Sequence, residues 1–143
     1  MSNLEKLDKT INTNSDVLIV EDNKFNRYVI ISFLKNMELT YDIAVNGKDG
    51  VYMTSNNMYR IILMDMHMPI MNGVDAIKEI VKKSHPPIIV MTANVYNFDK
   101  ENCRELGATS FISKPIDFDK FKKKINKYIL SKEIIDLKKI TTV

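Results

Sequence analysis

Five short, mostly apolar runs recur along this chain, and each is separated from the next by room for one helix. Three of them, at 17–20, 61–64 and 87–91, are almost wholly apolar. Strands that are buried on both faces of a parallel sheet have this composition. The runs at 41–45 and 109–113 contain more polar residues, as outer strands do. The pattern predicts a parallel sheet with the apolar strands in its interior.

The segments between these runs have helical character. Apolar residues recur at helical spacing over 25–37, 74–81 and 118–128, while the segments 47–58 and 96–106 are more polar and less regular. Residues suited to begin or stop these helices are Asn23, Asp117 and Gly107. Strands that alternate with helices of this length favour an α/β fold.

The chain of 143 residues is long enough for one domain with a substantial core. We expect residues 16–130 to form that domain, residues 1–15 to be a flexible polar leader, and residues 131–143 to be a tail that can extend the last helix. The sequence contains no secretory signal and no apolar run of membrane-spanning length. Its single cysteine suits a reducing compartment. These features predict a cytoplasmic protein without membrane insertion.

The last 30 residues are basic, with nine lysines and four acidic residues from Lys114 onward. Basic segments can bind nucleic acid. Here, however, the lysines are interleaved with apolar residues at helical spacing, which favours the solvated face of an amphipathic helix. We therefore expect no direct contact with nucleic acid.

Polar side chains follow four of the five predicted strands, at the point where each strand ends. Glu21 and Asp22 follow the first run, Asp65 the third, Thr92 the fourth and Lys114 the fifth. Ligands bind to open α/β sheets outside the carboxyl ends of the strands. If these strands are neighbours, the five side chains converge at one edge of the sheet.

Three carboxylates in close proximity repel one another unless a cation lies between them. A set of oxygen ligands without cysteine suits Mg²⁺, whose coordination is often completed by water and phosphate. Lys114 and Thr92 would supply a positive charge and a donor to phosphoryl oxygens. A carboxylate can itself accept a phosphoryl group, and Asp65, which stands alone after the central run, is the candidate.

Four segments in order carry a resemblance: "VLIVEDNKFNR", "IILMDMHMPIMNG", "IIVMTAN" and "GATSFISKPI". Together they resemble the receiver domain of response regulators in two-component and phosphorelay systems, over residues 16–130. The sequences of these segments are most similar to those of receivers attached to hybrid sensor histidine kinases. The resemblance implies a single doubly wound sheet of five parallel strands, in the flavodoxin-like order 2-1-3-4-5, with five helices.

The resemblance also implies roles for the polar residues. Asp65 would take a phosphoryl group from a phosphohistidine on a sensor histidine kinase or a histidine phosphotransfer protein. Mg²⁺, with Mn²⁺ as an alternative, would be held by Asp65, Asp22, Glu21 and the backbone carbonyl of His67. The side chain of His67, together with Asn94, would influence the lifetime of the phosphorylated state.

Further implied roles concern the switch. Thr92 would bond the arriving phosphoryl group, Lys114 would pair with the carboxylate or the phosphate, and the Lys114–Pro115 peptide bond would be cis. Thr92 and Phe111 would move together and change the face formed by 93–114. A partner would read this face, and the chain would be a monomer or a weak dimer through it.

Several alternatives stay open at this point. The chain can be a stand-alone receiver, a relay intermediate or part of a hybrid kinase, and that longer parent would be a histidine kinase. The receiver itself would be no conventional turnover enzyme, because transfer to it and loss of phosphate from it are self-catalysed. A degenerate receiver that acts as an unphosphorylated interaction module is a second reading. An aspartyl phosphohydrolase is a third, although His67 stands where such enzymes have a second aspartate.

Overall fold

The computed structural model describes residues 15–93 and 100–142, along which strands and helices alternate until two helices follow one another at the C-terminal end. The strands are β1 (Val17–Val20), β2 (Tyr41–Ala44), β3 (Ile61–Asp65), β4 (Ile88–Thr92) and β5 (Ser110–Ser113). The helices are α2 (Lys24–Asn36), α3 (Gly47–Asn56), α4 (Gly73–Ile80), α5 (Lys100–Leu106), α6 (Phe118–Tyr128) and α7 (Lys132–Thr142). Residues 96–99, the first part of the helix predicted at 96–106, lie outside the described residues.

The five strands form one parallel sheet in the order β2-β1-β3-β4-β5. This confirms the flavodoxin-like order. Every residue of β1, β3 and β4 is buried, whereas β2 and β5 at the two edges are only partly buried. The composition of the runs therefore predicted correctly which strands lie inside.

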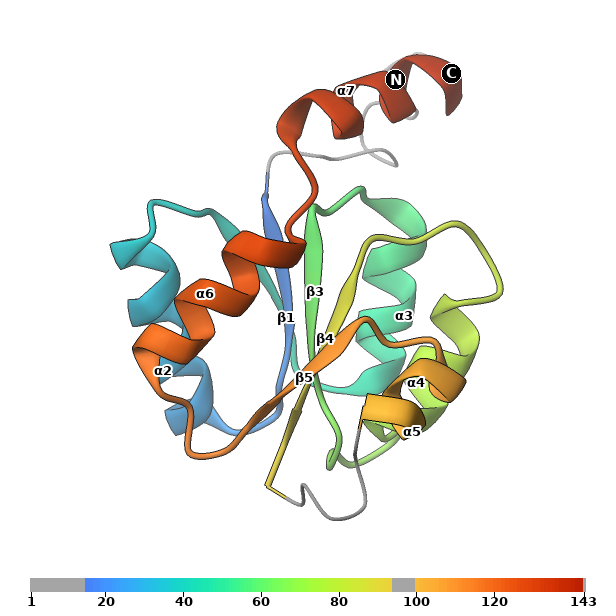
Figure 1. Cartoon of the computed structure of the whole chain (residues 1–143). Helices are drawn as coiled ribbons and strands as arrows, with labels where there is room; N and C mark the ends of the chain where they lie inside the picture. Colours follow the sequence, from blue (N-terminus) through green and yellow to red (C-terminus); the bar gives the residue numbers. More distant parts are fainter. Residues whose placement is uncertain (1–14, 94–99, 143) are drawn as a thin grey trace, which may run out of the picture.

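Two helical layers cover the sheet (Figure 1). Because side chains alternate along a strand, successive residues contribute to opposite cores. Val17, Ile19, Ile61 and Leu63 pack with residues of α2 and α6 on one face. Their neighbours in sequence pack with residues of α3, α4 and α5 on the other face.

Five of the described helices begin after a side chain that accepts a hydrogen bond from the backbone N–H three residues later. These capping residues are Asn23, Asn46, Asn72, Asp117 and Ser131. Gly107 follows α5 with φ +100°, a conformation that favours glycine, and a Cβ there would lie 2.9 Å from Cγ1 of Val81. The predicted caps at Asn23 and Asp117 and the predicted stop at Gly107 are confirmed.

The C-terminal segment differs from the sequence prediction. Backbone angles at Ile129 are extended (φ −64°, ψ 129°), so α6 ends at Tyr128 and residues from Lys132 form the separate helix α7. Within the described residues the tail thus forms a helix of its own, α7, and does not lengthen α6. It lies at the end of the sheet where the strands begin (Figure 1). None of the described helices is long and apolar enough to cross a lipid bilayer.

Arg60, next to β3, bonds the short segment between α6 and α7. Its Nε donates to the backbone carbonyl of Leu130 at 2.6 Å, and its guanidinium pairs with Asp16 at 3.1 Å. Leu130 N donates in return to the carbonyl of Arg60 at 3.1 Å. Burial alone would raise the pKa of Asp16, but the Thr40 amide and the Arg60 guanidinium outweigh it and hold that pKa below its usual value.

Candidate functional site

The sheet brings the predicted polar residues to one edge. Asp65 and Thr92 are the last residues of β3 and β4, while Glu21 and Lys114 directly follow β1 and β5. Since β1, β3, β4 and β5 are consecutive neighbours in the parallel sheet, their carboxyl ends lie side by side. The convergence predicted from the strand ends is therefore present in the structure.

Glu21, Asp22 and Asp65 form a cluster of carboxylates. One oxygen from each lies within 4.8 Å of the others. Glu21 is fully buried and Asp65 is 3% exposed, whereas Asp22 faces solvent. The cluster is thus anchored in the protein on one side and open to solvent on the other.

Lys114 supplies a positive charge to this cluster. Its Nζ lies 2.9 Å from Oδ1 of Asp65 and 3.4 Å from Oε2 of Glu21. Its backbone N–H donates to the carbonyl of Thr92 at 2.8 Å, which holds the end of β5 against the end of β4. The Lys114–Pro115 peptide bond is cis, as the family resemblance implied.

The charges in the site act on one another. Burial and the negative charge of Asp65 raise the pKa of Glu21, although Asn26 and Lys114 oppose this shift. Burial works to lower the pKa of Lys114, but the hydrogen bond and charge of Asp65, aided by Glu21, outweigh it and raise that pKa. Lys114 therefore remains an ammonium group at neutral pH, and the surplus of negative charge favours a further cation.

Two residues of α2 hold the acidic segment in place, and the sequence reasoning assigned them no role. Asn26 Nδ2 donates to Oε1 of Glu21 at 3.2 Å. The guanidinium of Arg27 donates to the backbone carbonyls of Glu21 and Asp22 at 3.1 and 2.8 Å. Both residues lie near the start of the helix capped by Asn23. Their position directly after the acidic pair is the sequence feature from which a supporting role could have been predicted.

The loop after β3 carries His67. Its backbone N–H lies 3.5 Å from Oδ1 of Asp65, and its side chain is exposed. Among the described histidine, cysteine and acidic residues, the cluster of potential metal ligands contains only the three carboxylates. The structure thus gives the imidazole no place among the ligands.

The predicted switch residues lie on β4 and β5. Thr92 is 2% exposed, and Phe111 is half-buried. Lys124 of α6 donates to the carbonyl of Phe111 at 2.6 Å, and its Nζ lies 5.2 Å from the centre of the Phe111 ring. Asn94 and part of the predicted 93–114 face lie outside the described residues.

The donor set of the site fits a hard divalent cation. All of the clustered ligand atoms are carboxylate oxygens, and Asp22 leaves the site accessible to water. Mg²⁺ prefers one or two carboxylates with several waters and phosphate oxygens. Glu21, Asp22 and Asp65 can therefore hold such an ion, with room for further oxygen ligands on the solvent side.

Comparison with known proteins gives consistent matches. The family model described as the response regulator receiver domain matches residues 17–126. Probable histidine kinase 1 of Oryza sativa subsp. indica is 33% identical over 79% of this chain. Hybrid signal transduction histidine kinase G of Dictyostelium discoideum is 33% identical over 85% of it. The matched regions cover only 15% and 4% of these relatives.

Solved structures of receiver domains share the fold of this chain. The receiver domain of a sensor histidine kinase from Pseudomonas aeruginosa, which has a magnesium ion in its active-site cleft, aligns with a TM-score of 0.73 and 29% identity, over 80% of this chain and 96% of that one. The receiver domain of Saccharomyces cerevisiae Ssk1, solved with the phosphotransfer protein Ypd1, gives a TM-score of 0.70 and 28% identity, over 81% and 89% of the two chains. The chain belongs to the response regulator receiver domain family.

Proposed function

We propose that this chain is a phosphoacceptor in two-component or phosphorelay signalling, with Asp65 as the accepting residue. The observation that carries the proposal is the placement of the buried Asp65 carboxylate 2.9 Å from the Lys114 ammonium, within a cluster of three acids. An oxygen of Asp65 forms a bond to phosphorus as the bond from phosphorus to the imidazole nitrogen of a partner's phosphohistidine breaks. The imidazole leaves, and the product is an acyl phosphate.

Charge neutralisation is the main requirement of this transfer. Glu21, Asp22, Asp65 and the backbone carbonyl of His67 would hold Mg²⁺, or Mn²⁺ in its place. The ion, when bound, neutralises negative charge on the phosphoryl oxygens. Lys114 contributes a second positive charge from within the protein, and it already lies within hydrogen-bonding distance of Asp65.

The remaining site residues would respond to the phosphoryl group. The Thr92 hydroxyl would bond a phosphoryl oxygen, and Phe111 would change its packing as Thr92 moves. Both residues lie on adjacent strands at the β4–β5 edge, which supports their coupling. His67 and Asn94 would influence the attack of water on the acyl phosphate and so its lifetime.

An apolar surface next to the site suits a protein partner. Phe25 and Tyr28 of α2 are each 72% exposed. Phe25 also lines a cavity of about 180 Å³ together with Lys114, Pro115 and Ile116. Exposed aromatic residues beside a reactive group are typical of a docking surface. A histidine phosphotransfer protein or a histidine kinase that docks here would bring its phosphohistidine to Asp65.

With this role we propose a cytoplasmic location for the chain. Because the chain matches only a small part of its curated relatives, a hybrid kinase parent is compatible with the proposal. The presence of Glu21, Asp22, Asp65, Thr92 and Lys114 together argues against a degenerate module that is never phosphorylated. A monomer or a weak dimer through the 93–114 face is the expected state.

Incubation with acetyl phosphate, followed by intact mass spectrometry, tests the proposal. We expect one phosphoryl adduct that requires Mg²⁺ and is lost on addition of EDTA. The Asp65→Asn variant should form no adduct, while Asp75→Asn, which changes an exposed aspartate of α4, should behave as the wild type. A stable chain without any adduct would favour the unphosphorylated module, and steady release of phosphate from added monoesters would favour a phosphohydrolase.

A further inference from the structure

A second cavity lies at the opposite end of the sheet from Asp65. It has a volume of about 340 Å³, within the range of small-molecule sites. Tyr59 and Pro86, which line it, lie just before the first residues of β3 and β4, whereas Asp65 and Thr92 are the last residues of these strands. The cavity is therefore separate from the carboxylate site.

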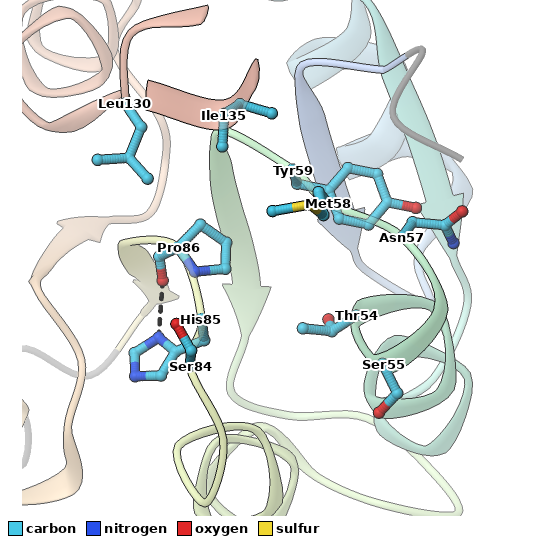
Figure 2. Close-up of a pocket in the computed structure, with 10 residues that line it drawn as sticks. All are labelled: Thr54, Ser55, Asn57, Met58, Tyr59, Ser84, His85, Pro86, Leu130 and Ile135. Atoms are coloured by element: carbon cyan, nitrogen blue, oxygen red, sulfur yellow. Dashed lines mark hydrogen bonds between the residues drawn. The ribbon is translucent and has the colours of Figure 1, made fainter. Parts of the chain in front are cut away.

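The walls of this cavity come from segments that are far apart in the sequence. Figure 2 shows side chains from the end of α3, the segment before β3, the loop before β4 and the start of α7 around a central space. The apolar part of the lining consists of Met58, Tyr59, Pro86, Leu130 and Ile135. Tyr59 and Ile135 are 2% and 5% exposed, so the apolar wall is well packed against the body of the domain.

The polar part of the described lining contains no carboxylate, ammonium or guanidinium group. None of the ten described residues around the cavity is Asp, Glu, Lys or Arg. A charged ligand would lose hydration here without gaining an ion pair. The lining therefore selects a neutral, mostly apolar molecule.

Several polar groups of the lining already use a donor hydrogen within the protein. Thr54 and Ser55 donate to the carbonyls of Gly50 and Val51, at 2.8 and 3.0 Å. The amide nitrogen of Asn57 donates to the carbonyl of Met53 at 2.9 Å. The hydroxyl and amide oxygens of these side chains retain lone pairs that can accept hydrogen bonds.

His85 and Tyr59 also use their donor hydrogen in a hydrogen bond within the protein. His85 Nδ1 lies 2.7 Å from the carbonyl oxygen of Pro86, which can only accept, so Nδ1 carries the proton and the neutral ring leaves Nε2 as an acceptor. The Tyr59 hydroxyl donates to Asp42 at 2.8 Å, and in Figure 2 it points away from Leu130 and Pro86. The polar lining thus offers mainly acceptors, and the complementary ligand is a donor.

We propose that this cavity is a second ligand site of the domain, for a small neutral molecule with an apolar body and one O–H or N–H donor. Such a ligand would lie between the body of the domain and Ile135 of α7. It would therefore bind more tightly when α7 is docked, and by linkage its binding would stabilise the docked helix. The inference is independent of the phosphoacceptor role of Asp65.

Indole tests the proposal, because it is neutral, mostly apolar and carries one N–H donor. The chain contains no tryptophan, so the fluorescence of added indole can be followed without a tryptophan background, with excitation at the long-wavelength edge where tyrosine does not absorb. We expect saturable binding with a dissociation constant of about 1 mM or lower. Indole-2-carboxylate and 1-methylindole, which add a charge and remove the donor, should each bind at least about threefold more weakly.

Two variants locate the site. Ile135→Phe should fill part of the cavity with the larger side chain. Indole could then enter only by overpacking the remaining space, so its binding should weaken by more than about tenfold. Leu137→Phe is the matched control, because Leu137 is 63% exposed on the same helix, and it should bind as the wild type does. Thr54→Val removes one acceptor and keeps the shape; it should weaken indole about threefold to tenfold and leave 1-methylindole unchanged.

Hydrogen exchange of α7 provides a readout of docking. Indole should slow amide exchange over 132–137 in the wild type and in Leu137→Phe, but not in Ile135→Phe. Absence of saturable indole binding to the wild type would overturn the proposal. Equal binding to Ile135→Phe and Leu137→Phe would overturn it too, as would preferential binding of the carboxylate.

Discussion

Replacing Lys114 with methionine removes the positive charge that balances two buried carboxylates. Lys114 Nζ lies 2.9 Å from Asp65 and 3.4 Å from Glu21, whose side chains are 4% and 1% exposed. Loss of one partner from a buried ion pair costs about 3–5 kcal/mol, because a buried charge stays uncompensated. The Lys114 side chain is itself 20% exposed, so solvent screens part of this interaction. We expect a loss of about 2–3 kcal/mol in the free energy of unfolding.

The assay is urea unfolding in EDTA and again in Mg²⁺. In EDTA the variant should show the full loss. At a Mg²⁺ concentration about 100 times the dissociation constant, binding to the folded state adds about 2.7 kcal/mol. The variant should gain more from Mg²⁺ than the wild type at equal concentration, since the ion no longer competes with the ammonium group for Asp65 and Glu21.

Lys122→Met is the control, because it removes an exposed lysine of α6 and should leave stability within about 0.5 kcal/mol of the wild type. If Lys114→Met in EDTA is as stable as the wild type, the carboxylates do not depend on Lys114 and the electrostatic account of the site is wrong. Equal stabilisation of both chains by Mg²⁺ would refute the proposed competition.

Three further predictions concern the metal, the pH dependence and the partner. Asp22→Asn should weaken Mg²⁺ binding at least about tenfold by calorimetric titration, because it removes one carboxylate ligand; unchanged affinity would exclude Asp22 as a ligand. Asp16→Asn should cost about 1–2 kcal/mol of stability at pH 7. Because the pKa of Asp16 is lowered in the folded state, this difference should be complete above the unfolded pKa and disappear as pH falls through the folded pKa; a difference that persists in acid would contradict it. Phe25→Ser should slow phosphoryl transfer from a histidine phosphotransfer protein at least about tenfold without changing the reaction with acetyl phosphate. Tyr52→Ser, which changes an exposed tyrosine of α3, should change neither reaction.

The arrangement of the site was predictable because residues at the ends of neighbouring parallel strands lie side by side. Three fully apolar runs identified the inner strands, and parallel strands end at the same edge. Asp65 and Thr92 follow from this rule alone, since each is the polar residue at which a buried run stops. Lys114 follows for the same reason, although its run lies at the edge of the sheet.

Other features depend on contacts that no local pattern encodes. Asn26 and Arg27 hold the Glu21 segment because the first turn of α2 folds back over it, which requires the actual path of the chain. The helix α6 ends at Tyr128, and Leu130 just beyond it forms hydrogen bonds with Arg60, a residue 70 positions away in the sequence. The cavity beside Tyr59 likewise exists only where separate segments meet α7. Apolar periodicity describes each helix but not how two of them are joined.

The most direct measurement of the central claim is the position of the acyl phosphate. Borohydride reduces an aspartyl phosphate to homoserine, so treatment of the phosphorylated chain followed by peptide mass spectrometry identifies the modified residue. We predict homoserine at position 65, only after incubation with acetyl phosphate and Mg²⁺. Reduction at Asp22 or Glu21, or an adduct that borohydride does not convert at Asp65, would contradict the account.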